Sequence, residues 1–74
     1  MGELPNAVVK RLLAQHGGGL RVSGSAIDEA VKATEEYLAR LARESQALAV
    51  ADKRKTVRDH DITKARAKIE SGGL

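Results

Sequence analysis

The chain has 74 residues, a net charge of +3 from 13 Lys and Arg against 10 Asp and Glu, and no cysteine. This length allows one domain, residues 1–74, whose core stabilises a fold by only a narrow margin. The absence of cysteine excludes disulfides and thiolate metal sites, and no apolar run approaches the ~20 residues that span a bilayer. With Tyr37 as the sole aromatic residue, association of helices is the remaining source of stability.

The first predicted helix covers residues 5–16. Proline is accepted in the first turn of a helix, because its missing N–H would be unpaired there. Leu4, Val8 and Leu12 recur at the spacing of one helical face. The glycines at 17–19 then end the helix, since glycine readily adopts the left-handed conformation of a C-terminal cap.

A long amphipathic stretch follows, and it predicts one helix over residues 25–52, with Ser23 or Ser25 as its cap. No glycine or proline interrupts it, and it is more than twice the length of an average globular helix. A helix this long cannot be covered by its own small chain, so we expect a second chain to cover it. The expected dimer core, which includes one residue of the last helix, is Ile27, Val31, Leu38, Leu41, Ala42, Leu48 and Ile62.

The last predicted helix covers residues 58–71, and residues 53–57 connect it to the long helix. Ile62, Ala65 and Ile69 lie at helical spacing and are expected to form its buried stripe. Two aspartates fall in its first turn, where the helix dipole favours negative charge. The chain is therefore predicted to be all-α.

Two basic connectors, residues 17–24 and 53–57, lie at the two ends of the long helix. The first contains Arg21-Val22-Ser23, and the second contains Lys53 and then Arg54-Lys55-Thr56-Val57. A helix of 28 residues would hold them roughly 40 Å apart at ~1.5 Å per residue. A second chain lying antiparallel would instead join the first connector of one copy to the second connector of the other. The two resulting basic sites would lie about 34–36 Å apart, one turn of duplex DNA.

Four short segments of the sequence resemble the archaeal histones, a histone-fold family. They are Glu3-Leu4-Pro5, Arg21-Val22-Ser23, Arg54-Lys55-Thr56-Val57 and Asp61-Ile62, in the family's order and within residues 3–68. The resemblance implies a histone fold, in which two chains cross their long helices antiparallel as a handshake homodimer. It also implies that double-stranded DNA wraps around the outside of the dimer.

The resemblance assigns roles to individual residues of this chain. Arg54 and Asp61 match a structural pair in which the arginine bonds a carboxylate of the third helix and braces the second connector. Lys53 stands where the family commonly has glycine, and there it adds a cation. The positions expected to contact DNA are Arg11, Arg21, Ser23, Lys53, Lys55, Thr56 and Arg58.

One departure concerns contacts between dimers, which involve Leu48, Ala51 and Asp61. Ala51 stands where archaeal histones usually have a histidine that bonds a neighbouring dimer's aspartate, at the position of Asp61. Isolated dimers and tetramers or larger assemblies on DNA therefore both stay open.

The sequence offers little support for chemistry other than DNA binding. His16 and His60 lack partner ligands at metal-site spacing, and no nucleophile motif or phosphate-cradling loop is present. We therefore expect no enzyme activity, no cofactor, no small-molecule substrate and no membrane contact. The first residues lack the pattern of a secretion signal, so a cytoplasmic, nucleoid-associated protein is expected.

Dimer symmetry favours DNA as the partner over a merely solvated basic surface. One tyrosine provides no stacking platform for single strands, and the long helix is occupied by dimerisation. We expect binding without strong sequence preference, through phosphates and DNA deformability, with Arg21 in a compressed minor groove. Two alternatives stay open: a histone-fold interaction subunit that heterodimerises in a larger DNA-associated complex, and a plain helical dimerisation module.

Overall fold

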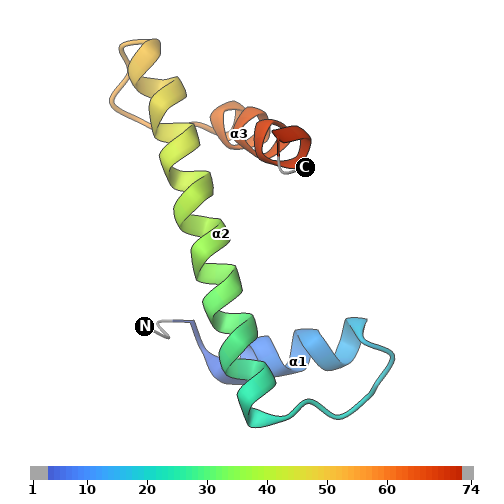
Figure 1. The fold of residues 1–74 in the computed structure, drawn as a ribbon. Coiled ribbons are helices and arrows are strands. Elements are labelled where there is room, and N and C mark those ends of the chain that lie inside the picture. The colour runs from blue at the N-terminus through green and yellow to red at the C-terminus, as the bar shows by residue number, and fades with distance from the viewer. Residues whose placement is uncertain (1–3, 73–74) are drawn as a thin grey trace. The chain divides into compact units, whose positions relative to one another are not determined.

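The computed structural model describes residues 4–72 and contains three helices in the order short, long, short, with no strand among these residues (Figure 1). The predicted all-α architecture is confirmed. Glu3, the start of the first family-like segment, and residues 73–74 of the tail lie outside the described residues. The helices are α1 Asn6–His16, α2 Gly24–Ala51 and α3 Asp59–Gly72.

Each helix differs by about one residue from its predicted bounds, and the caps explain the differences. Pro5 is the residue before α1, with φ −65° and extended ψ 120°, and as the cap its carbonyl accepts the N–H of Val9 at 3.2 Å. Asp52 falls in the turn after α2, not inside the helix. Arg58 precedes α3, and its carbonyl accepts the first helical bonds from Asp61 and Ile62.

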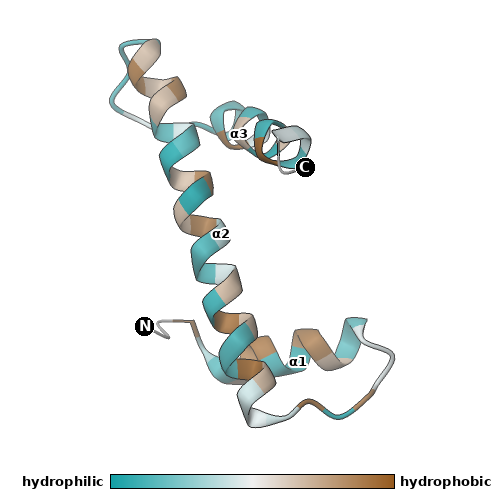
Figure 2. Cartoon of the chain, viewed as in Figure 1, coloured by the Kyte–Doolittle hydropathy of each residue, from teal (hydrophilic) through white to brown (hydrophobic). Residues whose placement is uncertain are grey.

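The internal contacts divide the chain into two compact units, Met1–Glu36 and Tyr37–Leu74, and α2 contributes residues to both. Along α2, apolar and polar residues alternate with helical period, as the hydropathy colouring in Figure 2 shows. No described helix is long and apolar enough to cross a membrane.

The first unit buries very little of its apolar surface. α1 has no buried residue, and Val31 of α2 is the one buried hydrophobic side chain within the described part of this unit. Val8 and Leu12 remain 41% and 42% exposed. An apolar groove of about 530 Å³ lies here, and its walls are Leu4, Pro5, Val8, Val9, Leu12, Leu13, His16, Gly17, Ala30 and Thr34.

The second unit has a small core made from α2 and α3. Among the described residues, Ile69 is the one large apolar residue buried there, and the other buried residues are small or paired: Ser45, Ala49, Asp61 and Ala65. Ser45 satisfies its hydroxyl by donating to the carbonyls of Leu41 at 2.7 Å and Ala42 at 3.2 Å. Small side chains at such positions permit two helices to pack closely.

The buried stripe predicted for α3 is wrong at one of its three positions. Ile62 is 38% exposed, and the buried stripe of α3 runs through Asp61, Ala65 and Ile69 instead. These three lie four residues apart on one helical face, and Ile62 lies about 100° further round. The stripe begins with a carboxylate because Arg54 compensates its burial.

Candidate nucleic-acid interface

The first connector begins with a glycine run whose backbone few other residues could adopt. Gly19 N–H donates to the carbonyl of Ala14 at 2.9 Å, which closes the end of α1. Gly18 and Gly19 both have φ 77°, in the left-handed region. A Cβ on Gly17 would lie 2.6 Å from the carbonyl oxygen of Leu13. The glycines therefore let the chain leave α1 sharply toward Arg21.

Ser23 is the residue that caps α2. Its Oγ accepts the backbone N–H of Ala26 at 3.1 Å, and its carbonyl accepts the N–H of Ile27 at 3.0 Å. Ser25, the other capping candidate, lies beside it, with 3.4 Å between the two hydroxyl oxygens. Arg21 is exposed just before this cap, so a cation and a helix start with free N–H groups lie together, an arrangement that suits an anion.

The second connector starts from a tight helix end at Lys53. Lys53 N–H donates to the carbonyl of Val50 at 2.9 Å, and Arg54 N–H donates to the carbonyl of Ala49 at 2.9 Å. This pair of bonds is a Schellman cap, whose central residue adopts the left-handed conformation and is usually glycine. Here Lys53 takes that place, with φ 57°, the one non-glycine residue at positive φ in the described chain.

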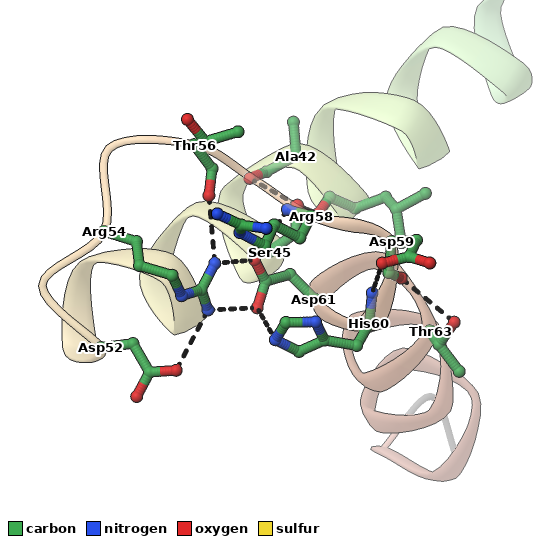
Figure 3. Close-up of polar contacts among 11 residues, drawn as sticks. Ala42, Ser45, Asp52, Arg54, Thr56, Arg58, Asp59, His60, Asp61 and Thr63 are labelled. Carbon is green, nitrogen blue, oxygen red and sulfur yellow. Dashed lines mark hydrogen bonds and ion pairs between the residues drawn. The ribbon is translucent and has the colours of Figure 1, made fainter.

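Arg54 is held by contacts within the fold and is half-buried, whereas its neighbours Lys53 and Lys55 are exposed. Its two terminal nitrogens donate to the two carboxylate oxygens of Asp61, each at 2.8 Å (Figure 3). Nη1 also donates to the carbonyl of Thr56 at 3.1 Å, and Nη2 to Asp52 at 3.2 Å. The hydrogen bonds to Asp61 raise the pKa of Arg54 further above its ordinary value. The expected structural pair is thus a contact across the connector.

Asp61 uses both its oxygens within its own chain. Besides Arg54, it accepts the backbone N–H of Arg58 at 2.9 Å, and His60 Nε2 lies 3.5 Å from Oδ1. A carboxylate three residues after the helix cap that accepts the cap's own N–H is half of a capping box. The Arg54 hydrogen bonds, then that of Arg58, hold the pKa of Asp61 well below its ordinary value of 3.8. Asp61 is 1% exposed and remains charged.

The other predicted DNA-contact cations are exposed, and none forms an ion pair within residues 4–72. The ion pairs of that part of the chain involve Arg54, His60, Arg66 and Lys68. Two of the unpaired cations belong to the first unit and three to the second. They are Arg11, Arg21, Lys53, Lys55 and Arg58.

The remaining predicted site residues are Thr56, expected to contact DNA, and the three residues expected to join two dimers. Thr56 is exposed and uses its carbonyl, not its hydroxyl, to hold Arg54. Ala51 is exposed at the last position of α2, and Leu48 is half-buried. Asp61, the third member, has its oxygens occupied by its own chain.

Only one of the seven residues expected in the dimer core is fully buried within its own chain. Leu38 is 54% exposed, and Ala42 and Ile62 are also exposed. Val31 is buried. The half-buried members are Ile27, Leu41 and Leu48.

Three contributions to this site were absent from the sequence interpretation. The capping role of Asp61 had a signal in the spacing of Arg58 and Asp61, three residues apart before an apolar stripe. No sequence signal indicated the hydrogen bonds from Arg54 to Asp52 and to the Thr56 carbonyl, because these bonds depend on the path of the turn. No three His, Cys, Asp or Glu side chains gather at one point in the described chain.

Comparison with known proteins identifies one similarity. The family model of histone-like transcription factor (CBF/NF-Y) and archaeal histone matches residues 2–65 of this chain. No curated protein and no solved structure gives a significant match.

Proposed function

Because the chain belongs to the family of histone-like transcription factors (CBF/NF-Y) and archaeal histones, we propose that it acts as a homodimer that bends, wraps or compacts duplex DNA. The family is one of chromosome-associated, DNA-binding proteins with a histone fold, so DNA binding follows from membership. The homodimer and the lack of strong sequence preference are the further content of the proposal.

The uncovered apolar surface supports the homodimer. α1 presents a groove with no buried residue of its own, and Leu38 in the middle of α2 is 54% exposed. Burial is worth roughly 25 cal/mol for each Å² of apolar surface, and a chain of this size has little other stabilisation. A second copy lying antiparallel along α2 would cover these residues and provide the missing core.

The observation that supports this mode of DNA binding is that only one of the connector cations is paired within the described part of its own chain. Arg54 is committed to Asp61, whereas Arg21, Lys53, Lys55 and Arg58 are exposed and unpaired. Arg54 therefore fixes the path of the connector and the positions of its neighbours, and it does not itself contact phosphate. In the antiparallel dimer, Arg21 of one copy lies beside Lys53, Lys55 and Arg58 of the other, and the two sites formed in this way bind one duplex.

Binding of this kind rests on phosphate charge and DNA shape. Lysine and arginine contacts to phosphate position a protein on DNA but carry no sequence information directly. Arg21, next to the free N–H groups at the start of α2, suits a narrow minor groove that faces the protein.

A matched pair of variants tests the proposal. Arg21→Ala removes an unpaired connector arginine, and Arg66→Ala removes an exposed arginine of α3 that pairs with Glu70. We expect Arg21→Ala to weaken DNA binding and bending and to leave the dimer intact, with Arg66→Ala close to wild type. Equal effects of the two variants on DNA binding would contradict the assigned role, and unfolding of Arg21→Ala would make that residue structural.

A second function has support because the matched family also includes histone-like transcription factors. A histone-fold subunit of a larger DNA-associated complex would pair with a different chain. Sedimentation equilibrium of the chain alone distinguishes the two: we expect a homodimer. A monomer that dimerises only with another histone-fold chain would favour the second function, and a dimer without DNA binding at physiological salt would favour a plain dimerisation module.

Assembly beyond the dimer depends on Asp61. Its oxygens are occupied by Arg54 and the N–H of Arg58 of its own chain, and Ala51 supplies no side-chain donor to a neighbouring dimer. We therefore propose isolated dimers on DNA. Nuclease digestion of reconstituted complexes should leave one short footprint, and a ladder of protected lengths would show that dimers stack.

A further inference from the structure

Leu20 is the most exposed large apolar side chain of the described residues, at 75%. It lies in the first connector, between the glycine run and Arg21. A Cβ added at Gly18, Gly19 or Gly24 would meet no atom within 4 Å. A side chain would have open space on either side of Leu20, and the exposure of Leu20 shows that the described part of its own unit leaves the leucine uncovered.

The segment of chain that contains Leu20 carries only positive charge up to Ile27, and the first acidic residues after it are Asp28 and Glu29 of α2. No acidic residue occurs anywhere in residues 4–27, whereas Lys10, Arg11 and Arg21 do. None of the three forms an ion pair with another described residue. A partner for this connector must combine negative charge with apolar surface a few ångströms away.

Duplex DNA has that combination in its minor groove. Phosphates line both edges, and apolar side chains such as leucine are able to enter between base steps and kink the duplex. Pyrimidine–purine steps such as TA unstack most readily, and A-tracts resist bending. An apolar side chain next to a groove-seeking arginine would therefore favour one kind of step over the other.

We propose that Leu20 is an apolar wedge that enters the minor groove beside Arg21 and directs bending to deformable base steps. The proposal deepens the DNA-binding function above and rests on it. Arg21 supplies the attraction to the groove, and Leu20 supplies a preference for flexible steps that phosphate contacts alone do not give.

Leu20→Gln and Leu20→Met form a matched pair for the test, because the two new side chains have nearly equal length and differ in polarity. Affinity is measured for two A·T duplexes of equal composition, one with central TA steps and one with A-tracts. Bending is measured by energy transfer between labels at the duplex ends. Sedimentation equilibrium of each variant without DNA reports the stability of the dimer.

We expect wild type and Leu20→Met to prefer the TA duplex by about tenfold, the equivalent of roughly 1.4 kcal/mol. Leu20→Gln should lose this preference for the TA duplex and bend it less, with the dimer and the salt dependence unchanged. Equal behaviour of all three proteins on the two duplexes would overturn the wedge. A weaker dimer in Leu20→Gln would also overturn it, by placing Leu20 against the partner chain. Failure of the wild type to bind either duplex would instead refute the proposed function itself.

Discussion

Lys53→Gly should make the protein more stable and its grip on DNA weaker. Lys53 has φ 57° at the end of α2, and a side chain in the left-handed region costs roughly 1–2 kcal/mol. Glycine removes that cost. It also has more conformational freedom in the unfolded chain, which lowers the free energy of unfolding by about 0.5–1 kcal/mol. The net expectation is a stabilisation of about 0.5–1 kcal/mol per chain. For a domain of this size that corresponds to a rise in Tm of about 2–8 °C.

The same substitution removes one unpaired cation from each chain. The slope of log K against log salt becomes shallower by about 0.9 for each phosphate that the protein no longer neutralises, which is about 1.8 for a homodimer. Stability and DNA affinity therefore change in opposite directions, whereas a purely structural residue would change them together.

Thermal unfolding followed by circular dichroism at fixed protein concentration, with DNA binding at several salt concentrations, checks both effects. Lys53→Ala is the matched control, because it removes the charge and keeps a side chain at positive φ. It should weaken DNA binding as Lys53→Gly does, without the gain in Tm. Equal Tm values for the glycine and alanine variants would refute the strain argument, and unchanged salt slopes in both would refute the phosphate contact.

The remaining predictions concern the brace and the first connector. The hydrogen bonds from Arg54 lower the pKa of Asp61 below 3.8, so its stabilisation is complete only from about one pH unit above that value. The unfolding free energy should fall as the pH drops from about 5 to about 2, and Asp61→Asn should flatten this decline. Arg54→Lys should lower the urea midpoint, because lysine cannot bridge both carboxylate oxygens, whereas Arg66→Lys on the exposed face should not. Gly17→Ala should destabilise through the 2.6 Å contact of its Cβ, and Gly24→Ala, which has open space, should not; chemical unfolding of the two variants checks this.

The sequence predicted most of the fold because local rules govern it. Three glycines end α1, an unbroken apolar period defines α2, and acidic residues begin α3, each within about one residue of the observed bounds. The errors at Pro5 and Arg58 arose because both residues precede their helices as caps. Propensity does not distinguish a cap from a first helical residue.

The candidate site was less predictable because it depends on turns and burial. Family resemblance suggested Arg54 with Asp61, but not the second acceptor at Asp52 or the capping bond from the N–H of Arg58. The sequence pattern placed Ile62 in the buried stripe, because it does not tell which of two neighbouring positions faces α2. The left-handed backbone of Lys53 follows from the Schellman bonds, which only the folded turn reveals.

The central claim is that unpaired cations on the outside of a homodimer bind DNA through its phosphates. Among the predicted DNA contacts each chain has five such cations, Arg11, Arg21, Lys53, Lys55 and Arg58, so a homodimer has ten. The most direct test is the affinity of the wild-type protein for a random-sequence duplex as salt is raised from about 50 to about 200 mM. We predict a linear fall of log K with log salt that totals about 10³–10⁵-fold. An affinity that changes less than about threefold over this range would contradict phosphate-dominated binding.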